Sequence, residues 1–380
     1  MAMRSGSIGR IISPFLLSVF TCAIAAQDDV ESNGVHFLRH QAYINHVLVS
    51  NGGVPADFKD ANLVNGWGVA LSAFSPMWVA DNGSGKSTLY DGAGHAIPLV
   101  VAVPGVGGAQ GKPTGIVFSG GEDFVVSTQT PGGPVSGPAR FVFVTEDGTV
   151  AAWAPTVNPT AAITVPTPDT GAIYKGLALS GDGATHLLYA ADFHNNRIDM
   201  FDGNFQPVQK PGAFVDPQLP NGYAPFGIQA INGDLYVTYA KQDADAEDEI
   251  AGRGFGFVDA YDPEGKLIGR FASRGVLNAP WGLALAPANF GEFSGALLVG
   301  NFGDGLINAY DPRTGRYLGT LSDEHERHIR IDGLWGIAFG NGVFAQKTNS
   351  LYYAAGPHDE SDGSYGVINP GAKKVRDGND

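Results

Sequence analysis

A short motif recurs six times along the chain: an aromatic or polar residue precedes a glycine, and a short apolar segment follows. The motif glycines are Gly68, Gly115, Gly176, Gly227, Gly282 and Gly336. Successive glycines are 47, 61, 51, 55 and 54 residues apart. Spacings of about 40–50 residues are typical of one propeller blade with its loops. The repeat therefore predicts a chain built from six similar units.

Each unit contains further strand-like segments. The second apolar segments are Met77–Ala80, Phe124–Ser127, Leu187–Ala191, Leu235–Thr238, Leu297–Gly300 and Leu351–Ala354. In four units a third segment ends in an aromatic residue and an aspartate, followed by Gly or Pro: Tyr90-Asp91, Phe201-Asp202, Tyr261-Asp262 and Tyr310-Asp311. Such pairs favour tight turns. Strands and turns alternate without a helical period, which predicts an all-β fold: a six-bladed β-propeller with four-stranded blades.

The ring has to close, and the last unit shows only three evident strands, ending near Ile368. The alternating segment Tyr43–Ser50 precedes the first unit and has no partner there. We expect this N-terminal strand to complete the last blade. The 61-residue interval between Gly115 and Gly176 leaves one alternative open, a seventh blade.

The N-terminus has the layout of a secretory signal peptide. Arg4 and Arg10 precede the apolar stretch Ile11–Ala25, and small residues follow at a cleavage site ending in Ala26. The stretch is interrupted by Pro14 and is shorter than the roughly 20 residues of a spanning helix, which disfavours the alternative of a membrane anchor. We therefore expect an extracellular or periplasmic protein. The expected organisation is a signal peptide (1–26), an N-terminal extension (27–42), the propeller (43–369) and a disordered tail (370–380).

The composition is acidic, with 23 Lys and Arg against 38 Asp and Glu and a net charge of −15. Removing Arg4 and Arg10 with the signal peptide leaves 21 against 38, a net charge of −17. Such a surface repels nucleic acid and anionic lipid and favours cationic partners or metal ions. We expect a monomer without membrane insertion or nucleic-acid partner, and a small molecule or glycan as its ligand.

Six stretches carry a resemblance to known proteins. They are Leu63–Gly68, Trp78–Gly83, Ala190–Asn195, Tyr239–Asp245, Gly300–Gly305 and Asp332–Gly336. They resemble the NHL-type propeller repeat and, more specifically, an uncharacterised family of secreted bacterial β-propeller proteins. The resemblance covers all units but the second and implies a propeller and export, but no reaction. Some members carry a C-terminal sorting signal, which the charged residues 373–380 do not provide.

In a propeller, ligands usually bind on the face where the first strand of each blade begins and the second ends, here called the upper face. Its inner ring should be the residues before the motif glycines: Trp67, Thr114, Lys175, Phe226, Trp281 and Trp335. Propeller lactonases hold a divalent cation there with Glu, Asn and Asp, and this ring lacks such oxygen ligands. It would bind an apolar or sugar-like ligand with an anionic group near Lys175, or fill the channel as packing. The candidate ligand-binding residues are Trp67, Phe226, Trp281, Trp335, Asn301 and Lys241.

The next ring should follow the second strands. Its members are Asp81 and Asn82, Thr128 and Gln129, Asp192 and His194, Lys241 and Asp243, Asn301 and Asp304, and His358 and Asp359. Two histidines beside carboxylates suit a transition metal or general acid–base chemistry, so His194, His358 and Lys175 are candidate catalytic residues. The acidic loop Tyr239–Glu249 offers oxygen ligands at alternate positions. Candidate ligands for a divalent cation, Ca²⁺ or Zn²⁺, are Asp192, Asp243 and Asp245; a solvated acidic loop is the alternative.

Two functions fit these observations. The first is a secreted binding or scaffold protein that recognises a small molecule, a glycan or a protein on its upper face. The second is an extracellular metal-dependent hydrolase or lyase with its site at the top of the channel. The fold does not choose between them, because propellers perform both roles.

Overall fold

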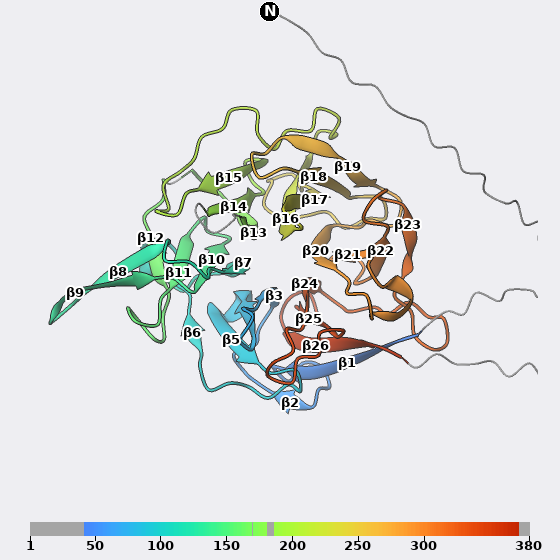
Figure 1. Cartoon of the computed structure of the whole chain (residues 1–380), viewed down its shortest axis with the longest axis horizontal. Helices are drawn as coiled ribbons and strands as arrows, with labels where there is room; N and C mark the ends of the chain where they lie inside the picture. Colours follow the sequence, from blue (N-terminus) through green and yellow to red (C-terminus); the bar gives the residue numbers. More distant parts are fainter. Residues whose placement is uncertain (1–41, 169, 181–185, 372–380) are drawn as a thin grey trace, which may run out of the picture. The chain divides into compact units, whose positions relative to one another are not determined.

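The computed structural model describes residues 42–168, 170–180 and 186–371, which belong to one compact unit. Six β-sheets surround a central axis, with the first strand of each sheet innermost (Figure 1). This confirms the predicted six-bladed all-β propeller. The predicted signal peptide and almost all of the predicted N-terminal extension and tail lie outside the described residues. Within the described residues, no helix has the length and apolar character needed to cross a membrane.

The first three blades follow the chain order from the inner strand outward. Blade 1 contains β3 (Gly66–Ala70), β4 (Met77–Asp81), β5 (Lys86–Tyr90) and β6 (Val101–Ala102). Blade 2 contains β7 (Pro113–Phe118), β10 (Phe141–Thr145), β11 (Val150–Trp153) and β12 (Ile163–Val165). Blade 3 contains β13 (Tyr174–Ser180), β14 (Leu187–Asp192) and β15 (Arg197–Phe201). Blade 3 thus has three strands in the described chain, where four were expected.

The remaining blades complete the ring. Blade 4 contains β16 (Tyr223–Ile231), β17 (Asp234–Lys241), β18 (Phe257–Tyr261) and β19 (Leu267–Ser273). Blade 5 contains β20 (Pro280–Leu285), β21 (Leu297–Asn301), β22 (Ile307–Tyr310) and β23 (Tyr317–Thr320). Blade 6 contains β24 (Leu334–Phe339), β25 (Leu351–Ala355), β26 (Ser364–Pro370), β1 (Tyr43–Ser50) and β2 (Phe58–Lys59). Three short 3₁₀ turns lie in the loops: η1 (Asn82–Ser84), η2 (Val106–Gly108) and η3 (Gly291–Phe293).

The motif glycines allow neighbouring blades to approach each other at the channel. A β-carbon added to any of them would collide with a backbone atom in the first strand of the next blade. The atoms and distances are the Thr114 oxygen at 2.5 Å for Gly68, the Leu177 nitrogen at 2.4 Å for Gly115, the Phe226 oxygen at 2.8 Å for Gly176, the Trp281 oxygen at 2.1 Å for Gly227, the Trp335 oxygen at 2.5 Å for Gly282 and the Trp67 oxygen at 2.6 Å for Gly336. Real β-carbons essentially never come within 3.0 Å of such atoms. The recurring glycine is therefore required by close backbone packing around the whole ring.

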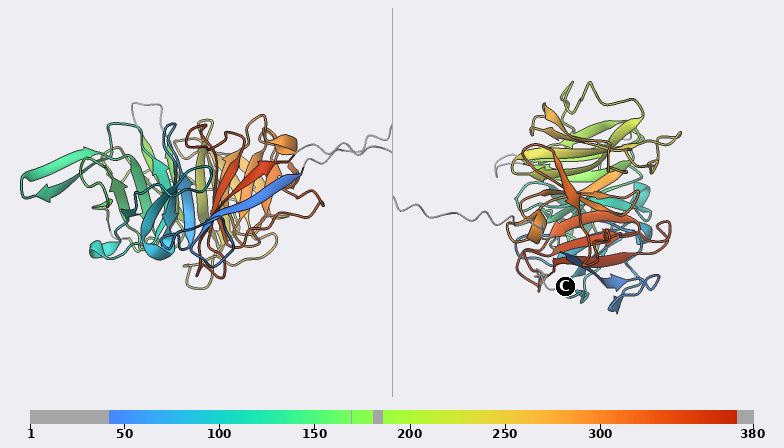
Figure 2. Two further views of the ribbon diagram at one scale, coloured as in Figure 1. Left: turned by 90° about the horizontal axis from the view of Figure 1, so that it is seen from below. Right: turned by 90° about the vertical axis from the view of Figure 1, so that its right-hand side faces the viewer.

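An inserted hairpin accounts for the longest interval between motif glycines. Strand β8 (Val125–Thr130) pairs with β9 (Gly133–Pro138) in a separate two-stranded sheet that projects from blade 2 (Figure 2). The second strand of this blade is β10, so the assignment of Phe124–Ser127 to that role was wrong, and the described residues of the interval form no seventh blade. Thr128 and Gln129 consequently lie in the hairpin and not at the exit of a second strand.

Strand β1 closes the ring as predicted, by antiparallel pairing with β26 in blade 6. Its first residue, Tyr43, is buried and reaches blade 5. The Tyr43 hydroxyl donates to the Phe290 carbonyl oxygen at 2.9 Å and accepts from the Phe293 backbone N–H at 3.0 Å. Its ring stacks on that of Phe293, with centroids 5.9 Å apart. The closing strand is thus anchored to the neighbouring blade as well as to its own.

Replacing Tyr43 by alanine should therefore lower the free energy of unfolding by about 3–5 kcal/mol, because a buried ring and two hydrogen bonds are lost. Ile44→Ala is the matched control, since Ile44 lies in the same strand but is 57% exposed. Urea denaturation of both variants measures the difference. Equal effects at the two positions would contradict the anchoring role of Tyr43.

Candidate functional site

Aromatic side chains fill the upper part of the channel. They form an aromatic plug consisting of Trp67, Phe193, Phe226, Trp281, Phe302 and Trp335. Trp335 lies at its centre, stacked on Trp67 at 3.4 Å and on Phe302 at 4.1 Å between ring centroids. Trp281 meets Trp335 edge-on at 5.7 Å and donates its indole N–H to the Lys175 carbonyl oxygen at 3.0 Å. The aromatic residues of the inner ring thus pack on one another. This agrees with the second of the two expectations, in which they fill the channel and do not form an open binding site.

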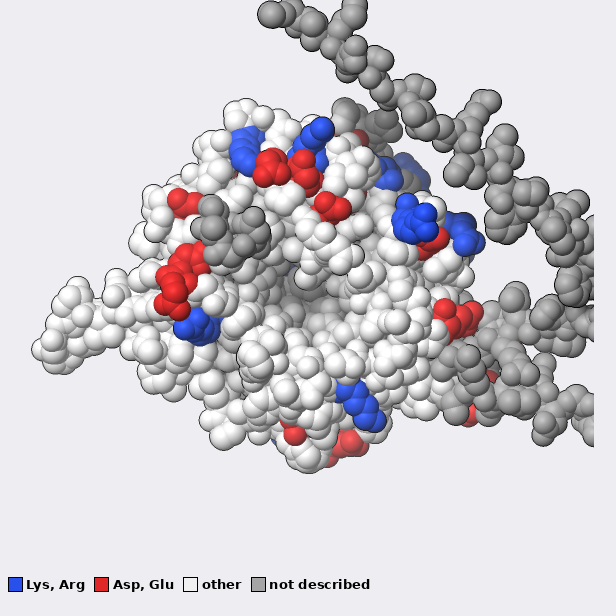
Figure 3. All heavy atoms as spheres, viewed as in Figure 1, with Lys and Arg blue, Asp and Glu red and all other residues white. Residues whose placement is uncertain are grey.

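Little empty space remains in the channel around the motif glycines. A space of about 30 Å³ is lined by four of these glycines, by Trp281 and by residues that follow the motif glycines. One face of the ring is hollowed at its centre (Figure 3). A volume of this size holds about one water molecule. This space is too small for an organic ligand, so we place the candidate binding site on the upper face above the plug.

Lys175 lies on the plug and is only 1% exposed. Its ammonium nitrogen is 5.2 Å from the centre of the Trp67 ring, 2.7 Å from Glu146 Oε1 and 3.0 Å from Asp248 Oδ1. Burial alone would lower the pKa of Lys175, but the two carboxylates outweigh burial and raise it. Lys175 is consequently charged and already paired, whereas the sequence suggested a free cation facing an anionic ligand.

Glu146 is a site residue that sequence reasoning missed. It follows β10 directly, at the upper exit of the second strand of blade 2. Its Oε2 accepts a hydrogen bond from Asn82 Nδ2 at 3.0 Å. Burial would raise the pKa of Glu146, but Lys175 holds it below the usual range, so it is ionised. The apolar run Phe141–Thr145 followed by a Glu-Asp-Gly turn was the signal that could have found it.

Two further acidic residues, Glu249 and Glu360, complete what we call the mouth cluster (Glu146, Lys175, Asp248, Glu249 and Glu360). Burial raises the pKa of Glu249 to about 8, and Lys175 opposes this shift only in part. Burial, with the nearby charge of Glu146, raises the pKa of Glu360 to about 7. Two carboxylates therefore contact the Lys175 ammonium, and two further carboxyl groups with raised pKa values lie within range of its charge.

Glu360 is held in the mouth by an unusual backbone. His358, Asp359 and Glu360 have φ angles of +57°, +51° and +64°, a left-handed turn formed entirely by residues other than glycine. Each such residue costs about 1–2 kcal/mol. Glu360 Oε1 and the nearby Asn65 Oδ1 are buried without hydrogen-bond partners. A strained segment thus places the Glu360 carboxyl group in the mouth, with one of its two oxygens unpaired among the described residues.

The two predicted catalytic histidines have separate partners. His194 Nδ1 is 3.2 Å from the Ala246 carbonyl oxygen at the surface of the acidic loop. His358 Nδ1 is 2.8 Å from Asp362, whose hydrogen bond raises the pKa of His358. Neither contact involves Lys175, so these bonds do not join the three predicted catalytic residues. Their catalytic roles stay predictions.

The predicted metal ligands serve local structure. Asp192 is fully buried, and it accepts hydrogen bonds from the backbone N–H groups of Ile173 and Asn195. Asp243 caps its own loop by accepting from the Glu247 N–H at 3.0 Å, and Asp245 is exposed. The described residues contain no group of three or more His, Cys, Asp or Glu side chains arranged to hold a metal ion. A metal role for these aspartates stays a prediction.

Asn301 and Lys241, two predicted ligand-binding residues, also contact the protein itself. Asn301 is buried at the end of β21 and donates to the Val276 carbonyl oxygen at 2.8 Å. The Lys241 ammonium lies 4.4 Å from the centre of the Phe255 ring. Both side chains therefore have partners within the protein, as the plug residues do.

The chain is similar in sequence to proteins of Acanthamoeba polyphaga mimivirus. It is 34% identical to uncharacterized protein R648 over 329 residues, which cover 84% of this chain and 78% of that protein. It is also 34% identical to uncharacterized protein L690 over 334 residues, covering 84% of each chain. These relatives are viral, whereas the sequence resemblance suggested a bacterial family. No family model matches the chain.

Solved propeller structures are more distant. A streptogramin B lyase is 14% identical with a TM-score of 0.49, and the match covers 86% of this chain and 97% of the lyase. The PQQ-bound aldose sugar dehydrogenase of Streptomyces coelicolor is also 14% identical with a TM-score of 0.49, covering 87% and 99%. Likeness at this level carries no information about activity.

The protonated carboxyl groups of the mouth cluster predict a dependence of stability on pH. The folded state retains protons that the unfolded chain, with glutamate pKa values near 4.3, releases. The free energy of unfolding should therefore fall as the pH rises from about 5 to 8. Urea denaturation across this range should show a shallower decline for Glu360→Gln than for the wild type. Glu247→Gln, an exposed position in the acidic loop, is the control. Identical slopes in all three proteins would contradict the role of Glu360.

Proposed function

The chain belongs to the family of the mimivirus proteins R648 and L690, and we propose that it is an exported binding protein that recognises a cationic group of its ligand at the mouth cluster. One observation carries this proposal: Glu146 and Asp248 pair with the ammonium of Lys175, and Glu249 and Glu360, whose pKa values are raised, lie within range of its charge. The acidic composition of the chain, with a net charge of −15, also favours a positively charged ligand.

A ligand ammonium or guanidinium would supply hydrogen-bond donors to unpaired acceptor oxygens in the mouth cluster. Glu360 Oε1 and Asn65 Oδ1 accept no hydrogen bond from the described residues, and the Asp248 side chain of the same cluster is 72% exposed. A cation near Glu249 and Glu360 would favour their ionised forms, so that binding releases protons. The strained turn at Glu360 supports a functional reason for its placement, because such strain is concentrated at binding and catalytic sites.

The arrangement favours binding over the acid–base chemistry first considered. Lys175 is engaged by Glu146 and Asp248, and the two histidines bond elsewhere. One observation still favours the alternative, an extracellular hydrolase or lyase. A carboxyl group that stays protonated near neutral pH, as Glu249 does, meets the requirement of a general acid. Catalysis would then use glutamates that sequence reasoning did not select.

Titration calorimetry with agmatine and spermidine tests the binding proposal. Affinity should rise between pH 6 and 7, by up to roughly tenfold for each proton released. Glu360→Gln should bind more weakly and lose part of this pH dependence, because it cannot ionise. Glu247→Gln should bind as the wild type does, since Glu247 is an exposed residue of the acidic loop and not a member of the mouth cluster. The proposal fails if neither amine binds, or if the two variants behave alike.

Export has its own test. A bacterial host that expresses the full chain should release a mature protein beginning at Gln27, because Arg4, Arg10 and the apolar stretch precede a small-residue cleavage site. Mass spectrometry of the secreted or periplasmic fraction measures the new N-terminus. Arg4→Glu combined with Arg10→Glu should reduce export. An uncleaved chain that remains in the cytoplasm would refute this part of the proposal.

A further inference from the structure

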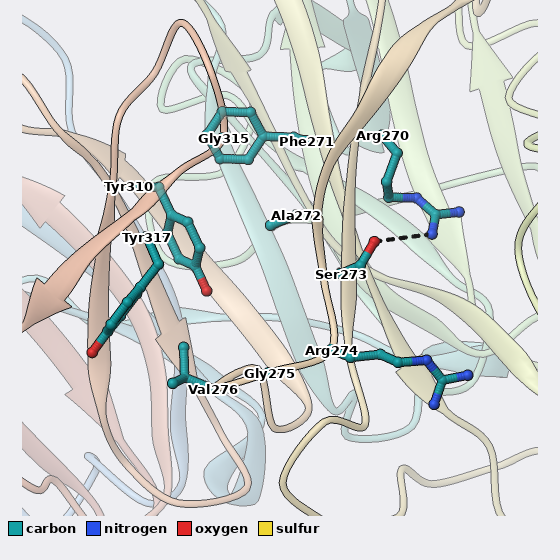
Figure 4. A pocket seen from close by; sticks show the side chains of 10 residues that line it. All are labelled: Arg270, Phe271, Ala272, Ser273, Arg274, Gly275, Val276, Tyr310, Gly315 and Tyr317. Atoms are coloured by element: carbon teal, nitrogen blue, oxygen red, sulfur yellow. Dashed lines mark hydrogen bonds between the residues drawn. The ribbon is translucent and has the colours of Figure 1, made fainter.

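A second recess lies on the outer part of the ring, between blades 4 and 5. It has a volume of about 310 Å³. One wall is the end of β19 with the segment that follows it to Val276, and the other is formed by β22, β23 and the turn between them (Figure 4). This volume is at the lower end of the range for small-molecule sites. The recess, here called the blade 4–5 groove, is far larger than the space inside the channel.

The groove contains a tyrosine hydroxyl that forms no hydrogen bond within the described part of the protein. Tyr310 is only 4% exposed, yet its hydroxyl has no hydrogen-bond partner among the described residues, and it points into the groove (Figure 4). Tyrosines occupy the same position at the end of the third strand in two other blades. There the hydroxyl of Tyr90 donates to Asp60 at 3.0 Å, and that of Tyr261 is 2.7 Å from the Tyr239 hydroxyl. Tyr310 differs from these two by the lack of a partner.

Aromatic rings form the walls around this hydroxyl. The ring centroid of Tyr310 is 6.0 Å from that of Phe271 and 5.8 Å from that of Tyr317. Tyr317 is 42% exposed at the rim, so part of its ring is open to a ligand. The Ser273 hydroxyl on the opposite wall is turned toward Arg270 and accepts a hydrogen bond from its guanidinium at 3.5 Å (Figure 4). The groove thus combines apolar ring surfaces with the hydroxyl of Tyr310.

The two arginines that line the groove hold their charges away from its tyrosines (Figure 4). Arg270 forms ion pairs with Asp216 and Asp259. The guanidinium of Arg274 lies 5.4 Å from the centre of the Phe257 ring. Both side chains point away from Tyr310 and Tyr317 (Figure 4). A ligand of this groove is therefore expected to be neutral, in contrast to the cationic ligand of the mouth cluster.

We propose that the blade 4–5 groove binds a neutral pyranose unit of a glycan. A pyranose has apolar C–H faces that pack on an aromatic ring such as Tyr317, and hydroxyl groups, one of which would pair with that of Tyr310. The unpaired Tyr310 hydroxyl gains a partner in this complex, which an aliphatic ligand would not provide. This site is independent of the mouth cluster and of the proposed function there.

Isothermal titration with cellohexaose, maltohexaose and chitohexaose tests the groove. At least one of the three should bind, and Tyr310→Phe should weaken that binding about fivefold to tenfold, the effect of one hydrogen bond. Tyr310→Phe should not lower the melting temperature, because no internal hydrogen bond is lost. Tyr317→Ala, at the exposed rim, should weaken the same binding further.

Two control variants distinguish binding in this groove from binding elsewhere on the propeller. Tyr90→Phe removes a hydroxyl from the matching position in blade 1 and should lower stability without changing glycan binding. Glu360→Gln should leave glycan binding unchanged, because it lies in the mouth cluster. The proposal is overturned if none of the three oligosaccharides binds, or if Tyr310→Phe and Tyr317→Ala both bind as tightly as the wild type.

Discussion

The contact on which the rest of the structure depends is that of each motif glycine with the backbone of the next blade. In all six junctions a β-carbon would meet a neighbouring backbone atom at 2.1–2.8 Å. The last contact, from Gly336 to Trp67, joins blade 6 to blade 1 and closes the circle. In a closed ring, a side chain at one junction would displace blades at the others as well. The narrow channel and its contents follow from this spacing.

Because the ring is narrow, the residues before the glycines meet at its centre. Trp67 and Trp335 stack there, with their centroids 3.4 Å apart. Lys175 comes from the same ring of positions, but its ammonium cannot remain buried among aromatic rings without a counter-charge. Loops from other blades supply Glu146 and Asp248 for this purpose. The aromatic plug and the mouth cluster are therefore two consequences of one geometric constraint.

The sequence predicted the parts that repeat and failed where the chain departs from the repeat. The motif located the six inner strands, and the unpaired segment Tyr43–Ser50 located the closing strand. Glu146 was missed because the β8–β9 hairpin displaces the true second strand of blade 2. The acidic loop that ends at Glu249 was selected, but Glu360 and the raised pKa values of both residues were not predicted, because the burial behind them arises where loops of different blades meet. No local pattern in either loop encodes that meeting.

The mouth cluster also depends on closure of the ring. Lys175 belongs to blade 3, Glu146 to blade 2, Asp248 and Glu249 to the loop that follows β17 of blade 4, and Glu360 to blade 6. Blade 6 is completed by β1, which Tyr43 fastens to blade 5. The distance between these carboxyl groups is thus set by the whole ring and not by any one blade. Since their pKa values rest on mutual burial and charge, a weaker closure would let water reach the cluster and return those values toward the ordinary range. The pKa values of the mouth cluster therefore depend on ring closure by β1.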